Sequence, residues 1–157
     1  MDALVIGPPG GLADSVARGL RREGERVLQA TADDAADAAR AAWLMEEARS
    51  PALVIVIEPD PFTAARTLLP LCRGAELVVV AEQRVALARA GTAPGRSLAL
   101  RALRRDTLGR GRRLGIVSLG RAGRRWVELD GRGAALGADR AAAVVLRACG
   151  AGAASSR

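Results

Sequence analysis

The feature that most constrains this chain is a regular alternation of short apolar runs with longer segments of helical periodicity. The runs ALVI at 3–6, ALVIVI at 52–57 and ELVVVA at 76–81 lack the polar alternation of a half-exposed strand. They are typical of strands buried on both faces of a parallel sheet. Strands that alternate with helices of about ten to fifteen residues form right-handed βαβ units, which predicts an α/β fold in three layers.

The same pattern extends over most of the chain. Strands are expected at 3–6, 26–30, 52–57, 76–81 and 114–119, with a sixth, shorter one at 126–129. Helices are expected from Leu12 to Gly24, from Asp33 to Ala48, from Pro61 to Cys72, from Pro94 to Leu108 and from Ala138 to Cys149. We therefore predict a mainly parallel sheet of about five to six strands in one domain over 1–150, followed by a flexible tail over 151–157.

Composition fits a single soluble domain. Half of the 157 residues are hydrophobic, and no apolar run approaches the length of about 20 residues that crosses a bilayer. We therefore expect no membrane association and a cytoplasmic location. The two cysteines, Cys72 and Cys149, lack the spacing of a metal site, and the chain contains no histidine. We expect two buried free thiols and no bound metal.

The net charge of +7 raises the question of a nucleic-acid partner. All 24 basic residues are arginine, and the chain has no Lys, Asn or Tyr, a bias that a GC-rich genome explains more economically than a polyanionic ligand. Nine arginines over 101–125 would suit a phosphate-tracking face. Stacking aromatics are missing there apart from Trp126, so we expect a solvated face and keep an Arg-rich nucleic-acid-associated protein as a second alternative.

A glycine-rich turn separates the first strand from the first helix. The segment VIGPPGGLADSVARGLRREG at 5–24 resembles the opening of the short-chain dehydrogenase/reductase family, whose fingerprint is Thr-Gly-x-x-x-Gly-x-Gly. The three glycine positions fall on Gly7, Gly11 and Ala13. Similar segments follow in the family's order: PALVIVIEP, TLLPLCRGAELVVVA and LALRALRRDTLGRGRRLGIVSLG, so that the likeness covers roughly residues 3–120.

This resemblance implies a Rossmann-like fold and a dinucleotide held at the turn. The cofactor-binding positions would be Gly7, Gly10, Gly11, Leu12 and Ala13. Only one helix fits between 30 and 52, so the fold is expected to be one strand-helix unit shorter than the family. After residue 120 the family's substrate-binding segments have no clear counterpart.

Several residues weaken the predicted phosphate site. Pro8 and Pro9 carry no amide hydrogen to donate, and Asp14 brings a carboxylate into the first helical turn. Ala13 replaces the glycine that permits close helix packing. We therefore expect these cofactor positions to be vestigial and no cofactor to be bound.

The residues at the end of the second strand also argue against NAD binding. Gln29 and Ala30 stand where an acidic residue would hold the ribose 2′-hydroxyl. Arg21 or Arg22 lies near enough in sequence to meet a 2′-phosphate, so NADP is less excluded than NAD.

The family's reaction needs Tyr, Lys, Ser and Asn, and three of these residue types do not occur in the chain. The long helix aligns either Arg89 and Ala93, or Thr92 and Arg96, with the Tyr and Lys positions. A threonine hydroxyl is too weakly acidic to donate a proton at neutral pH, and arginine stays protonated. No catalytic residue is therefore predicted.

Acidic residues supply the remaining site candidates. Glu58 and Asp60 follow the third strand, at the edge where open α/β sheets bind ligands, and they form the candidate ligand cleft. Asp33, Asp34 and Asp37 would suit a cation, but their place at a helix start is explained by capping and by the helix dipole.

The expected partner surface comes from the resemblance. In the family, the helices equivalent to 61–72 and 94–108 pack against a second subunit, and here they carry Leu68, Leu69, Leu71, Leu98, Leu100, Leu103 and Leu108. We expect a degenerate, non-catalytic subunit that forms homo-oligomers or supports an active relative. The alternative from another class is an NADP-dependent oxidoreductase with atypical catalytic residues.

Overall fold

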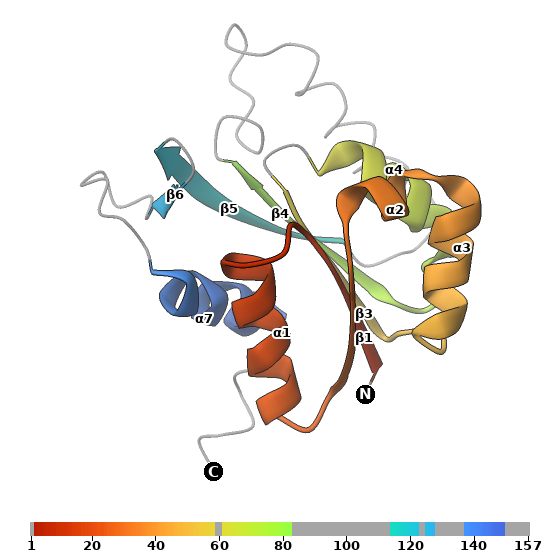
Figure 1. Ribbon diagram of the computed structural model, residues 1–157, viewed down its shortest axis with the longest axis horizontal. Coiled ribbons are helices and arrows are strands. Elements are labelled where there is room, and N and C mark those ends of the chain that lie inside the picture. Colours follow the sequence, from red (N-terminus) through yellow and green to blue (C-terminus); the bar gives the residue numbers. More distant parts are fainter. Residues whose placement is uncertain (1, 59–60, 83–113, 123–124, 128–136, 150–157) are drawn as a thin grey trace, which may run out of the picture.

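The computed structural model describes residues 2–58, 61–82, 114–122, 125–127 and 137–149 (Figure 1). The strands are β1 (Asp2–Ile6), β2 (Arg26–Ala30), β3 (Leu53–Ile57), β4 (Glu76–Glu82), β5 (Leu114–Ala122) and β6 (Arg125–Val127). The helices are α1 (Leu12–Arg22), α2 (Ala32–Ala36), α3 (Ala38–Glu47), α4 (Phe62–Leu68) and α7 (Ala138–Ala148), with a 3-10 turn η1 (Leu69–Leu71) after α4. The predicted α/β class is confirmed.

The strands form one sheet in the order β2-β1-β3-β4-β5-β6. The first five are mutually parallel, and β6 pairs antiparallel with β5. The chain moves from β1 outward to β2 and then crosses to the other side of β1 to form β3. Strand order therefore reverses between β1 and β3, and a crevice at such a point is where open α/β sheets bind ligands.

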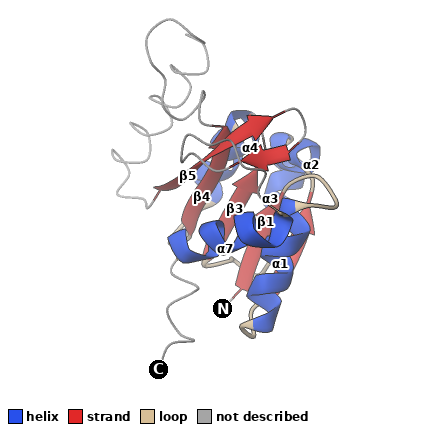
Figure 2. Cartoon of the chain, turned by 90° about the vertical axis from the view of Figure 1, so that its left-hand side faces the viewer, coloured by secondary structure: helices blue, strands red, loops and turns tan. Residues whose placement is uncertain are grey.

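Two helical layers cover the sheet (Figures 1 and 2). One apolar core lies between the sheet and α2, α3 and α4, and it includes Leu4, Val54 and Leu68. The other lies between the sheet and the pair α1 and α7, and it includes Val5 and Ile55. Successive residues of β1 and β3 thus enter opposite cores, which is why these strands are apolar at every position from Ala3 to Ile6 and from Leu53 to Ile57.

The segment predicted as one helix over 33–48 is two helices. Asp37 has an extended backbone (φ −82°, ψ 128°), and its side chain accepts a hydrogen bond from the backbone N–H of Arg40. Asp37 therefore ends α2 and caps α3. An alanine-rich stretch hides such a break because helix propensity alone favours continuing through it.

The helix predicted over 61–72 begins after Pro61 as expected and ends in η1, where Pro70 lies in the tightened last turn. Leu68 and Leu69 are buried in the chain's own core, and Leu71 is half-buried. Leu68 and Leu69 are therefore not among the leucines left over for a partner surface, and the expected surface on this helix stays a prediction.

Other predictions fall partly or wholly outside the described residues. The helix expected over 94–108 and the tail over 151–157 lie outside them, whereas the last helix is present as α7. The expected strand at 126–129 is described over Arg125–Val127. Within the described part of the chain, no helix is both long enough and apolar enough to span a membrane.

Candidate functional site

The candidate site is the turn from Gly7 to Gly11, at the carboxyl end of β1 where the strand order reverses. Gly10 and Gly11 have positive φ angles of 81° and 72°, a region that side-chain-bearing residues rarely enter. Gly11 directly precedes α1 and makes no side-chain cap. The turn thus has the shape that brings backbone amides to a helix N-terminus, as in anion-binding turns.

Gly7 is required by close packing. Its amide donates to the carbonyl oxygen of Ala30 at 3.0 Å. A Cβ at this position would lie 2.9 Å from the Cβ of Ala13 and 2.9 Å from the carbonyl oxygen of Ile57. Gly7 therefore lets β1, β3 and the start of α1 meet, and Leu12 and Ala13 are buried beside it. These three predicted cofactor positions serve the packing of the core.

The carboxylate of Asp14 binds the turn from within the chain. Its Oδ2 accepts a hydrogen bond from the backbone N–H of Gly10 at 2.8 Å. Its Oδ1 accepts one from Nε2 of Gln29, at the end of β2, at 2.9 Å. An internal anion thus takes the Gly10 amide, in the turn that leads into α1.

A further arginine fixes this arrangement. Arg21 donates from one guanidinium nitrogen to Oε1 of Gln29 at 3.0 Å and to the carbonyl oxygen of Val27 at 3.1 Å. Gln29 is therefore oriented so that its amide nitrogen points at Asp14. Both arginines considered for a 2′-phosphate are exposed, and Arg21 is held against β2 by its two hydrogen bonds.

The electrostatics of the turn oppose a bound pyrophosphate. Pro8 and Pro9 have no amide hydrogen, the Gly10 amide is already taken, and Asp14 adds a negative charge in the first turn of α1. Two unit charges about 4 Å apart interact by roughly 1 kcal/mol in water and about 4 kcal/mol near a protein surface. For the half-buried Asp14 we take about 2 kcal/mol of repulsion, or about thirtyfold in affinity.

The other predicted site residues are only partly within the described structure. Glu58 follows β3 directly and is half-buried. Asp60, the second residue of the candidate cleft, lies outside the described residues, as do Arg89, Thr92, Ala93 and Arg96. The cleft pair and the degenerate catalytic positions therefore stay predictions.

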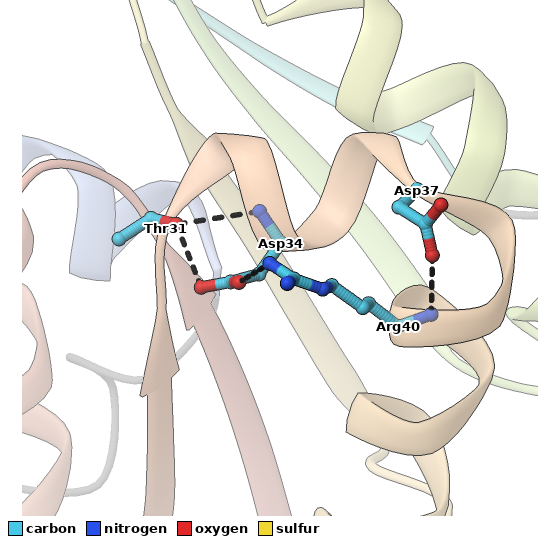
Figure 3. A network of polar contacts seen from close by, with 4 residues as sticks. All are labelled: Thr31, Asp34, Asp37 and Arg40. Carbon is cyan, nitrogen blue, oxygen red and sulfur yellow. Dashed lines mark hydrogen bonds and ion pairs between the residues drawn. The ribbon is translucent and has the colours of Figure 1, made fainter.

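The acidic cluster near α2 is a capping network (Figure 3). Thr31 caps α2, accepting from the backbone N–H of Asp34 and donating its hydroxyl to Oδ2 of Asp34 at 2.7 Å. Arg40 donates to Oδ1 of Asp34 at 2.9 Å. These hydrogen bonds, with that from the Thr31 hydroxyl largest, lower the pKa of Asp34. Among the described residues no group of three metal-binding side chains occurs.

Sequence reasoning missed two groups of residues. The contact between Gln29 and Asp14 depends on how β2 lies against α1, and no local pattern signals it. Trp43 on α3 is 58% exposed and lines a cavity beside β2. A tryptophan in an otherwise alanine-rich helix is the sequence signal that could have indicated this surface.

Fold and turn together define a Rossmann-like α/β domain. No protein-family model matches the sequence, and no curated protein matches it. Among solved structures, the fold is similar to that of a dTDP-4-dehydrorhamnose reductase from Clostridium acetobutylicum, with a TM-score of 0.55 and 15% sequence identity. The match covers 75% of this chain and 52% of the reductase, so the chain spans about half its length. This likeness shows the fold alone.

Proposed function

We propose that this chain is a non-catalytic relative of the short-chain dehydrogenases whose Rossmann-like domain has given up dinucleotide binding. The observation that carries the proposal is the hydrogen bond from the Gly10 amide to the Asp14 carboxylate at 2.8 Å. A carboxylate built into the chain takes the place where the family's cofactor would present its phosphates. The turn then serves the packing of β1 against α1.

The residue inventory supports loss of the reaction as well as loss of the cofactor. Carbonyl reduction by the family passes a proton from a tyrosine whose pKa a lysine lowers, and this chain contains neither residue type. Arginine does not replace the lysine, because it is too weak an acid to exchange protons at neutral pH.

We further propose that the domain acts as a subunit, either in a homo-oligomer or beside an active relative. A Rossmann-like domain without its chemistry keeps a rigid sheet and helical layers that can present a binding surface. Leu68 of α4 and Leu69 of η1 are buried in the core, whereas Leu71 is half-buried. The helix expected over 94–108 stays part of this proposal.

Calorimetric titration of the purified chain with NADP⁺ and NAD⁺, together with a hydride-exchange assay, tests the first proposal. We expect no binding at millimolar concentration and no exchange. Asp14→Ala removes the charge and releases the Gly10 amide, so any residual NADP⁺ affinity should rise by about thirtyfold. Asp33→Asn, which removes an exposed charge away from the turn, is the control and should change nothing. Micromolar binding by the unaltered chain contradicts the proposal.

The subunit proposal has its own measurement. Light scattering after size-exclusion chromatography should give a mass above 16.2 kDa, or capture from native extract should return a dehydrogenase-like partner. A strict monomer without such a partner refutes it.

One observation favours the alternative of an NADP-dependent oxidoreductase with rebuilt chemistry. Gly10 and Gly11 keep positive φ, and a Cβ built on either meets nothing within 4 Å, so the turn itself is open. Turnover of a carbonyl substrate with NADPH by the purified protein would establish that alternative.

A further inference from the structure

Strand β2 has a side without a partner strand in the described part of the molecule. It pairs with β1 alone and stands at the end of the strand order. The Ala30 carbonyl faces β1, since it accepts from the Gly7 amide, and alternate residues of a parallel strand face the same neighbour. Val27 and Gln29 therefore direct their backbone N–H and C=O groups outward. Among the described residues, the one partner of these groups is Arg21, which donates to the Val27 carbonyl.

A groove runs along β2 on the side of α3. A cavity of about 260 Å³ lies between Leu28, Ala30 and Trp43, and a second of about 170 Å³ lies between Arg26, Leu28 and Glu47. Leu28 lines both cavities, so they adjoin. Trp43 is 58% exposed, and among the described residues it is the one large apolar side chain that is exposed to solvent.

The charged side chains that line the two cavities are Arg26 and Arg40, Asp34 and Glu47. Arg26 is paired with Asp2 at 2.9 Å. Arg40 at the first cavity is already paired with Asp34 at 2.9 Å (Figure 3). Glu47 is exposed and lines the second cavity, which leaves a carboxylate there for a cationic side chain.

The spacing of Trp43 and Glu47 suits an added strand. They lie four residues apart on α3, about 6 Å along the helix axis and on one face of it. Side chains two apart on a strand point to one face and lie about 7 Å apart. A strand laid along β2 would therefore put one side chain beside Trp43 and the next one on that face beside Glu47.

We propose that the outer edge of β2 and this groove bind an extended, basic segment of a partner protein as an additional strand. An apolar side chain of the segment fills the Trp43 cavity, and an arginine or lysine two residues away reaches Glu47 and the face of the tryptophan ring. Backbone hydrogen bonds to Val27 and Gln29 supply the register, with Arg21 leaving the Val27 carbonyl.

Charge favours a basic partner segment over a second copy of this chain. A second copy paired through β2 would offer Arg26 as its basic side chain at this edge, and that guanidinium is already paired with Asp2 at 2.9 Å. The proposal does not rest on the loss of dinucleotide binding, so either one can fail without the other.

The test uses the full chain and two synthetic peptides, acetyl-Thr-Thr-Val-Thr-Arg-Thr-Thr-amide and the same peptide with glutamate for arginine. Binding is followed by calorimetry and by ¹⁵N amide shifts. We expect the arginine peptide to bind below millimolar concentration with shifts centred on 26–30 and 40–48, and the glutamate peptide to bind at least tenfold more weakly.

Variants separate the groove from other surfaces. Trp43→Ala and Glu47→Gln should each weaken the arginine peptide about fivefold, and Glu47→Gln should reduce the preference for arginine over glutamate. Glu46→Gln is the matched control, because Glu46 is exposed on the same helix and does not line the groove. Circular dichroism confirms that each variant is folded.

Three results would overturn the proposal. They are no binding of the arginine peptide at 1 mM, equal binding of the two peptides, and shifts confined to residues away from β2 and α3. Self-association of the chain with shifts at β2 would also overturn it, because the occupant would then be a second copy.

Discussion

Replacing Gly7 with alanine tests how the turn is built into the fold. The added Cβ would lie 2.9 Å from Cβ of Ala13 and from the carbonyl oxygen of Ile57, whereas carbon atoms in contact normally lie about 3.5 Å or more apart. One neighbour is a methyl group fixed on α1 and the other is backbone of β3, so neither moves without its element. Overpacking of this kind costs about 1–3 kcal/mol, and two rigid contacts place Gly7→Ala near 3 kcal/mol.

A smaller effect opposes this cost. Alanine lowers the entropy of the unfolded chain, which stabilises the folded state by about 0.4–1 kcal/mol where the backbone permits it. We therefore expect a net loss of about 2 kcal/mol in the free energy of unfolding, measured by urea titration followed by circular dichroism. Gly137→Ala is the control, since Gly137 has φ −58° and nothing lies within 4 Å of its added Cβ. A loss below 0.5 kcal/mol for Gly7→Ala would refute the packing argument.

Three further predictions concern single side chains. In a double-mutant cycle, Asp14→Ala and Gln29→Ala should couple by about 0.5 kcal/mol because of their 2.9 Å hydrogen bond, and additivity would contradict the contact. Burial, with a smaller contribution from Glu76, raises the pKa of Cys149 from 9.0 to about 12. At pH 8, mass spectrometry should therefore find Cys149 alkylated at least about tenfold more slowly in the native than in the unfolded chain, and equal rates would refute this. The hydroxyl of Thr31 lowers the pKa of Asp34 in the folded chain below its ordinary value of 3.8. The loss of stability in Thr31→Val should therefore be largest above pH 3.8 and should shrink as the pH falls through the lowered pKa of the folded chain. A difference in the free energy of unfolding that does not change with pH in urea titrations would contradict this.

Strands were the most predictable part of the fold. The runs at 52–57 and 77–80 are apolar at successive positions, as is typical of strands buried on both faces of a sheet. The first turn was equally clear, because glycines between a strand and a helix have few other uses. These sequence patterns are local, so they predict the strands and the turn without knowledge of tertiary contacts.

Features set by tertiary contacts were less predictable. The break at Asp37 is invisible in an alanine-rich pattern, and the burial of Leu68 and Leu69 depends on where α4 meets the sheet. Leucines at helical spacing fit a core and an interface equally well. Only the position of α4 against β3 and β4 decides between the two.

The candidate site divides in the same way. The sequence placed the Asp14 carboxylate in the first turn of α1, so weakened phosphate binding could be predicted from it. It did not reveal that Gln29 holds that carboxylate, or that Arg21 holds Gln29, because both contacts join residues of separate elements. Neither Cys72 nor Cys149 is in a disulfide. Both thiols were predicted to be buried, which is confirmed for Cys72, whereas Cys149 is half-buried.

We propose that the Asp14 carboxylate takes the place of a phosphate group at the turn. The most direct measurement is an NMR titration of the ¹⁵N-labelled chain with NADP⁺ that follows the amides of Gly10 and Gly11. We expect no shift of either amide up to 5 mM NADP⁺ in the unaltered chain. In Asp14→Ala we expect a saturable shift of the Gly10 amide. A saturable shift at the turn of the unaltered chain below millimolar NADP⁺ would contradict it.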